Sequence, residues 1–367
     1  MKRFQSLPII MCMILTLALS GCSIPLPMEL SRRLIIEAVG VDTEKNGVKI
    51  TLQTVDAFFG EQGKEGGDKK GSTEIYGFQG QNAAEALAKV EETTGLKPMF
   101  SQIKLIVLSE ETARKGVKEI LEYFLNETRL RPDIDVCVSE GKAQDVVAAK
   151  LGSSAGAAGV LQETLRAAAK TGRTVRTLLF RFMSLLYSEI DTPLCPVISV
   201  RKSDVSDSLL PALTGAALFD GDVLRKKIGE EETQLLAFLT GGAKKTEMTV
   251  SLENGDLVSA LFLSPRVQRK LICQNSTFSA VLTLRAVCSV TQKSQKNNAS
   301  TEALLAQIRK QLSTRLRLCF QSLCADAGFD FCRLKKRCAQ KYPSFSAEKD
   351  GEALLKNVII QLEIKQK

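Results

Sequence analysis

Apolar and polar side chains alternate along the chain after residue 32 in a way that predicts a sheet with covering helices. Residues 34–42 and 48–55 each alternate, and the Asn46-Gly47 dipeptide between them is typical of the tight turn of a β-hairpin. Further along, helices are expected at about 82–92, 111–125, 157–169 and 175–188, and strands at about 103–108 and 134–138. This alternation indicates a mixed sheet with helices packed on it.

The second half of the chain follows the proline-punctuated segment 193–198 and the polar stretch 201–208. Beyond them we expect strands at about 214–219, 247–252, 258–263, 280–290 and 358–364, and a helix from about Glu230. A long helix starts after Ser300 or Thr301, and one of its faces is apolar through Leu305, Ile308, Leu312, Cys319 and Leu323. Because the neighbouring strands need a cover, a core helix is favoured over a helix lying on a membrane.

These elements predict an α+β fold with two or three mixed-sheet domains and covering helices. We expect an N-terminal domain over residues 22–203 and a C-terminal α/β domain over residues 209–367. The middle helices of the first domain could form a separate unit. The glycine-rich segment 60–72 is expected to be a flexible surface loop, and its spacing does not fit a phosphate-binding P-loop.

The first residues have the pattern of a bacterial lipoprotein signal peptide. Lys2 and Arg3 precede an apolar run over residues 7–19, and the small residues Ser20 and Gly21 precede Cys22. We therefore predict a signal peptide over residues 1–21, cleavage between Gly21 and Cys22, and an S-diacylglycerol on Cys22, whose new amino group could also be acylated. Two acyl chains, at about 0.8 kcal/mol per buried CH₂, anchor a protein stably. An ordinary secretory leader is the alternative, and the run is too short for a retained span.

Composition argues against most enzyme mechanisms. The chain has no histidine, which removes the commonest general base, the imidazole metal ligand and every Ser-His or Cys-His pair. The 41 acidic residues show no motif with a defined spacing. We therefore predict no catalytic residues, no cofactor and no metal, and a protein that is not an enzyme.

The net charge of +9 is concentrated near the C-terminus. Nine residues between Arg309 and Lys341 are basic, against Asp326 and Asp330. For an exported, lipid-anchored chain this charge favours proximity to anionic lipid headgroups over nucleic acid. A solvated helix face is the favoured interpretation of the basic segment itself.

Eight cysteines remain besides Cys12 in the leader and Cys22. The last four, Cys319, Cys324, Cys332 and Cys338, have gaps that fit neither a zinc C-x₂-C pair nor a redox C-x-x-C. Disulfides can form outside the cytoplasm. The other four, Cys137, Cys195, Cys273 and Cys288, sit in apolar, strand-like runs, where a free thiol behaves as a small buried hydrophobe.

Five motifs follow the leader in a fixed order. They are Glu29–Asp42 (ELSRRLIIEAVGVD), Lys104–Ala113 with its continuation to Leu125, Gly215–Leu224 (GAALFDGDVL) with Glu230–Thr233, Asp326–Phe331 (DAGFDF), and Tyr342-Pro343. In this order they resemble the Ger(x)C family, the lipoprotein C subunits of spore germinant receptors. The likeness covers nearly all of the chain after Cys22. Ser23-Ile24 replaces the family's Trp-Asp after the lipidated cysteine, Gln102 replaces a histidine, and no tryptophan follows Tyr342-Pro343.

The resemblance implies a non-enzymatic subunit tethered through Cys22 to the outer face of the inner spore membrane. Its partners would be the integral-membrane A and B receptor subunits, with ligand binding in the complex biasing its conformation. The resemblance does not say whether this subunit itself contacts a nutrient. A solute-binding lipoprotein of an importer is the alternative, although the sequence lacks the aromatic residues that often line such clefts.

Overall fold

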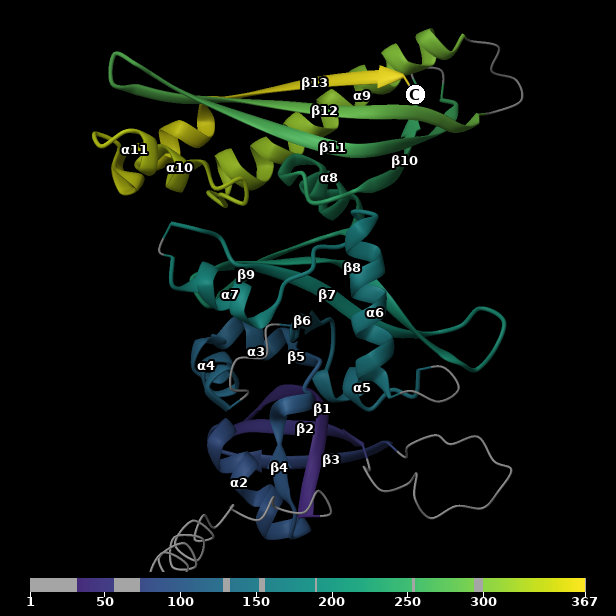
Figure 1. Cartoon of the computed structure of the whole chain (residues 1–367), viewed down its shortest axis with the longest axis vertical. Coiled ribbons are helices and arrows are strands. Elements are labelled where there is room, and N and C mark those ends of the chain that lie inside the picture. The colour runs from purple at the N-terminus through teal and green to yellow at the C-terminus, as the bar shows by residue number, and fades with distance from the viewer. Residues whose placement is uncertain are drawn as a thin grey trace, which may run out of the picture.

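The computed structural model describes residues 32–55, 73–127, 133–151, 156–188, 190–252, 255–293 and 300–366. The predicted signal peptide, Cys22 and the segment 60–72 lie outside the described residues. The described chain is elongated, with a large twisted sheet running from the lower end to the middle of the view and a second sheet at the upper end (Figure 1). Both sheets are mixed, which confirms the predicted α+β class.

The large sheet has the order β3-β2-β1-β5-β6-β7-β8-β9. Its strands are β1 (Arg33–Glu44), β2 (Gly47–Val55), β3 (Thr73–Gly80), β5 (Leu105–Ser109), β6 (Asp135–Ser139), β7 (Leu194–Lys202), β8 (Leu209–Asp220) and β9 (Val223–Ile228), and the short β4 (Lys97–Met99) pairs with β1. Strands β1, β5, β6 and β7 run parallel in the middle, whereas antiparallel hairpins close both ends. The predicted Asn46-Gly47 hairpin is confirmed, with Glu44 opposite Gly47.

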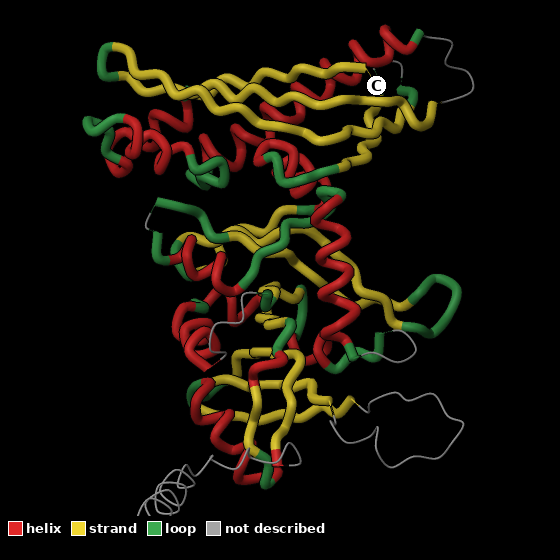
Figure 2. The backbone as a smooth tube through the Cα atoms, viewed as in Figure 1, coloured by secondary structure: helices red, strands yellow, loops and turns green. Residues whose placement is uncertain are grey.

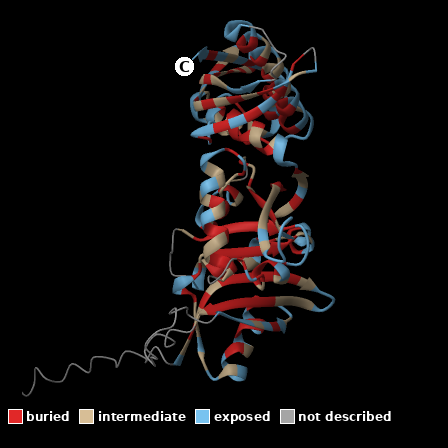
Figure 3. Ribbon diagram, turned by 90° about the vertical axis from the view of Figure 1, so that its right-hand side faces the viewer, coloured by how far each residue is buried: buried red, intermediate tan, exposed pale blue. Residues whose placement is uncertain are grey.

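Helices cover both faces of this sheet, which accounts for the burial of every residue of the central strands β5 and β6. On one face, α2 (Ala83–Thr94), α3 (Glu110–Lys115), α4 (Lys118–Glu127) and α7 (Leu179–Leu186) pack on residues such as Val39 and Ile106. On the other, α5 (Ala143–Val147) and α6 (Ala157–Lys170) pack on Ala38 and Val107. Helices and strands are distinguished by colour in Figure 2, and the buried central strands are red in Figure 3.

The helix predicted over 111–125 is divided in two at Gly116. This residue has φ +119°, a conformation that favours glycine, and a side chain there would meet the Asp222 carboxylate at 2.8 Å. The backbone N–H of Val117 donates to the Asp222 carbonyl at 3.1 Å. Contact with the β8–β9 turn therefore ends α3 and starts α4 on a new axis.

The second sheet has the order β10-β11-β12-β13. Its strands are β10 (Lys245–Ser251), β11 (Leu257–Gln274), β12 (Thr277–Lys293) and β13 (Val358–Gln366), and its helices are α8 (Glu230–Thr240), α9 (Thr301–Phe320), α10 (Leu334–Lys341) and α11 (Ala347–Lys356). The helices lie on the face that is turned toward the large sheet (Figure 1). Helix α9 buries the predicted apolar face and begins at Ser300, whose hydroxyl accepts the Ala303 N–H.

Two strands of the second sheet, β11 and β12, are longer than the predicted strands at 258–263 and 280–290. Strand β11 continues past Pro265 through a bulge between Leu263 and Arg266, where Ser264 adopts φ +46°. Because a bulge leaves residues out of the ladder, the proline costs no pairing hydrogen bond there. Strands β11 and β12 consequently form an 18- and 17-residue hairpin.

The β8–β9 hairpin connects the two halves of the molecule. It is hydrogen-bonded to the large sheet through β7. Ala217 and Phe219 on one face belong to the core under α7, whereas Ala216 and Leu218 on the other belong to the core of the second sheet. The division predicted between residues 203 and 209 stays a prediction about separately folding units, since the large sheet continues across it.

Candidate functional site

The loop after α7 meets the start of α10 at a buried carboxylate, and this contact joins the two halves. Asp191 accepts hydrogen bonds from Nε and Nη2 of Arg333, each at 3.0 Å, and from Nζ of Lys336 at 3.1 Å. The Asp191 side chain is 1% exposed, whereas its two partners are about a third exposed. We call this set of three residues the junction clamp.

Asp330 organises the same junction from the other side. Its carboxylate accepts the backbone N–H groups of Leu334 at 2.9 Å and Lys335 at 2.7 Å, and so caps the first turn of α10. Its own N–H donates to the hydroxyl of Thr192 at 3.0 Å. Arg333, between them, adopts the left-handed conformation with φ +57°, which directs its guanidinium to Asp191.

The pKa values of the two buried carboxylates are shifted in opposite directions. Burial raises the pKa of Asp191, but hydrogen bonds from Arg333, Ser188 and Lys336 outweigh it and hold the pKa below its usual value. Burial also raises the pKa of Asp330, and there the backbone hydrogen bonds from Leu334 and Lys335 do not offset it. The junction therefore holds Asp191 as an anion more firmly than Asp330.

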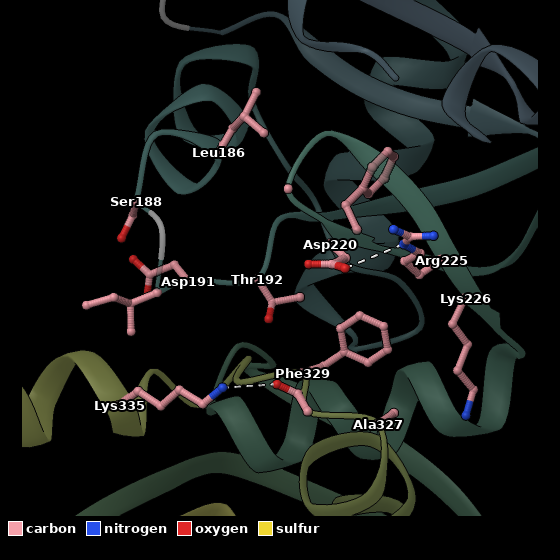
Figure 4. Close-up of a pocket in the computed structure, with 14 residues that line it drawn as sticks. Leu186, Ser188, Asp191, Thr192, Asp220, Arg225, Lys226, Ala327, Phe329 and Lys335 are labelled. Carbon is pink, nitrogen blue, oxygen red and sulfur yellow. Dashed lines mark hydrogen bonds and ion pairs between the residues drawn. The ribbon is translucent and has the colours of Figure 1, made fainter. Parts of the chain in front are cut away.

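A pocket of about 500 Å³ opens beside the clamp, between the β8–β9 turn and the chain before α10 (Figure 4). Lysine and arginine side chains line it together with the Asp191 and Asp220 carboxylates, and Leu186 and Ile190 supply apolar surface. Arg225 lies 3.5 Å from Asp220. Lys335 donates from Nζ to the Gly328 carbonyl at 3.4 Å.

Other buried carboxylates of the large sheet have structural partners. Asp42 accepts the N–H groups of Ala143 at 2.8 Å and Gln144 at 2.9 Å, at the start of α5. Asp135 accepts both Nε and Nη2 of Arg176, at 2.7 and 2.9 Å, and Nε2 of Gln162 at 3.2 Å. These pairings fasten helices to the sheet.

The described cysteines are free thiols, and seven of the eight are buried, with Cys273 half-buried. The expectation of small buried hydrophobes in strand-like runs is confirmed for Cys137, Cys195 and Cys288. Burial raises the pKa of Cys288 and Cys338 to about 11 and that of Cys332 to about 12, so these groups are poor nucleophiles at neutral pH. Within the described ranges, no three Cys, Asp or Glu side chains converge to hold a metal ion.

The predicted lipidation and cleavage residues, Cys22 and Gly21, lie outside the described residues. The solvated face predicted for the basic segment is wrong in part, because several of its charges contact the rest of the fold. Arg333 and Lys336 bind Asp191, and Arg315 binds Glu231 at 2.6 Å. The clamp was not predictable from sequence, since Asp191 is separated from Arg333 by 142 residues and belongs to no periodic pattern.

The fold and its junction define an elongated, two-sheet α+β protein whose halves are joined by ion pairs beside a pocket. In the part of the chain that the structure describes, no helix has both the length and the apolarity needed to cross a membrane. Residues 27–200 match the model of the spore germination protein N-terminal domain, and residues 214–367 match that of the spore germination B3/GerAC-like C-terminal domain. The chain therefore belongs to the Ger(x)C family of spore germination proteins, and the resemblance found in its motifs is confirmed.

Two curated proteins are similar to the chain. It is 24% identical over 211 residues to the spore germination protein GerQC of Bacillus cereus, covering 58% of this chain and 55% of that protein. It is 26% identical over 253 residues to the putative spore germination protein YfkR of Bacillus subtilis strain 168, covering 68% of this chain and 63% of that protein. The matched region thus spans less than two thirds of the length of each relative.

A solved structure has the same fold. The crystal structure of the GerBC protein superposes with a TM-score of 0.53 at 15% identity, covering 90% of this chain and 96% of that one. At this identity the likeness concerns the arrangement of both sheets and their helices.

Proposed function

We propose that this chain is the lipid-anchored C subunit of a spore germinant receptor and acts with integral-membrane A and B subunits in nutrient-triggered germination. The observation that carries the proposal is the match of both family domains in order, over residues 27–200 and 214–367. The names of GerQC and YfkR, both germination proteins, support it.

The chemistry of the chain supports a role in assembly and signalling without catalysis. The sequence has no histidine. The buried carboxylates Asp42, Asp135 and Asp191 are each held by backbone N–H groups or by cations of the fold. Such partners stabilise a structure, whereas a catalytic carboxylate needs access to a substrate.

The position of β1 supports an orientation on the membrane. Strand β1 begins at Arg33, eleven residues after Cys22 (33 minus 22), and even a fully extended linker of that length spans at most about 40 Å. Strand β1 lies in the part of the large sheet that is farthest from the second sheet (Figure 1). With the lipid on Cys22, the α2 end of the molecule faces the outer surface of the inner spore membrane and the second sheet extends away from it.

Deletion of the gene tests the receptor role. We expect spores to lose the response to one nutrient while detergent and calcium dipicolinate still trigger germination, and the wild-type gene should restore the response. An unchanged nutrient response in a strain without redundant receptors would contradict the proposal. Impaired uptake of a solute in such a strain would instead support the importer lipoprotein.

The anchor is tested by Cys22→Ala, with Cys12→Ala in the predicted leader as the matched control. We expect Cys22→Ala to abolish incorporation of labelled fatty acid and to release the protein from the membrane fraction, because two acyl chains supply the anchoring energy. Cys12→Ala should remain lipidated. Full membrane retention of unlipidated Cys22→Ala would refute the anchoring part of the proposal.

A further inference from the structure

We propose that the pocket beside the junction clamp binds a small organic anion, a carboxylate attached to an apolar group, which contacts both halves of the molecule. Residues from three distant parts of the sequence line this pocket: 186, 188 and 190–192, then 219–221, 225 and 226, and finally 327–329 and 335. Its volume of about 500 Å³ lies within the range typical of small-molecule sites, which favour places where two structural units meet.

The charge of the ligand follows from two ammonium groups. Neither Lys226 nor Lys335 forms an ion pair with a carboxylate among the described residues, although both line the pocket. Their neighbours in sequence differ, since Lys227 pairs with Glu110 and Lys336 with Asp191. A bound anion would give these two ammonium groups a charged partner.

The two carboxylates that line the pocket do not oppose an anion strongly. Asp191 is neutralised by Arg333 and Lys336, and Asp220 lies beside Arg225. Lys335 comes from the α10 side of the pocket and Lys226 from strand β9, on the other side of the Phe329 ring in the view of Figure 4, so each half of the molecule contributes one cation to the pocket.

The apolar part of the ligand follows from the remaining walls. Leu186 and Ile190 are half-buried and offer apolar surface to the pocket, whereas Phe219 and Phe329, which are 1% and 8% exposed, lie almost wholly behind it. Water against such surface is released when an apolar group replaces it, at about 25 cal/mol per Å². An inorganic anion would use the lysines and leave this surface wet, which is why an amphipathic carboxylate is the better fit.

The test uses the full, processed chain in detergent and benzoate as the probe, observed by ligand NMR. We expect saturable binding in the millimolar range or tighter, and binding weaker by about tenfold for benzamide, which lacks the charge, and for acetate, which lacks the ring. The double variant Lys226→Met, Lys335→Met keeps the apolar stems and should lose tenfold or more in affinity. Lys45→Met, Lys245→Met, at two exposed positions elsewhere, is the control with the same change in net charge and should bind as the wild type.

Absence of saturable benzoate binding would overturn the inference. So would equal binding of benzoate and benzamide, equal binding of benzoate and acetate, or unchanged affinity in the pocket double variant with an unchanged urea midpoint. The inference concerns the purified chain alone, so its failure leaves the germination phenotype, and with it the proposed receptor role, untouched.

Discussion

Replacing Asp191 by asparagine removes the charge of the junction clamp and keeps its shape. The carboxylate is 1% exposed and accepts three charge-assisted hydrogen bonds. Breaking a fully buried pair costs about 3–5 kcal/mol. Arg333 and Lys336 are 34% and 33% exposed, so water can solvate them once the anion is lost. We therefore expect Asp191→Asn to lower the free energy of unfolding by about 2 kcal/mol, measured by urea unfolding followed by far-ultraviolet circular dichroism.

The pH dependence distinguishes this cause from a loss of packing. The folded-state pKa of Asp191 is lowered, so its contribution is present above the unfolded pKa of about 3.9 and is lost as the pH falls through the lower folded value. The difference between wild type and Asp191→Asn should be constant between about pH 5 and 7 and shrink below about pH 4. Asp207→Asn is the control, because Asp207 is fully exposed and pairs with Lys202 at 3.6 Å, and it should change nothing measurable. Equal effects of the two substitutions, or an undiminished difference in acid, would refute the argument.

Two further predictions concern backbone and thiols. Gly47→Ala should destabilise the protein by about 2 kcal/mol or more in urea unfolding. The reason is that Gly47 has φ +133° and a Cβ there would lie 2.1 Å from the Gly80 carbonyl oxygen. Gly141→Ala is the control and should cost far less, because a Cβ at Gly141 meets no atom within 4 Å. Among the described thiols, Cys273 should react first with a thiol reagent at neutral pH, and the seven buried ones should react only as the protein opens; rapid modification of Cys332 in the folded state would contradict this.

The sequence pattern predicted those helices and strands that are determined by residues close together in the chain. Alternation and the Asn46-Gly47 turn located the first hairpin, and helical periodicity located α9 together with its buried face. The break at Gly116 depends on Asp222, 106 residues later (222 minus 116), so no window of sequence around the helix contains its cause. Strand β11 passes Pro265 because a bulge accommodates it, which depends on the pairing partner β12. Contacts between residues that are distant in sequence determine both features, and the periodicity of the sequence carries no information about such contacts.

The junction was not predictable for the same reason, and it matters more for function. Asp191 lies in the loop after α7 and Asp220 ends strand β8, whereas Phe329 and Lys335 follow more than a hundred residues later in the other half. The motif Asp326–Phe331 marked one wall as a family feature, but only the fold shows that Thr192 holds the Asp330 N–H and that Asp330 caps α10.

The β8–β9 hairpin makes this junction mechanically significant. Its alternate faces belong to two cores, through Phe219 on one side and Leu218 on the other, so the halves cannot separate without exposing both. The clamp and the pocket lie at a further contact between the halves, beside this hairpin. A ligand bound in this pocket would favour one placement of the second sheet by its differential affinity for that placement. In a subunit anchored at the α2 end, as proposed above, such a preference would reorient the second sheet relative to the anchored end.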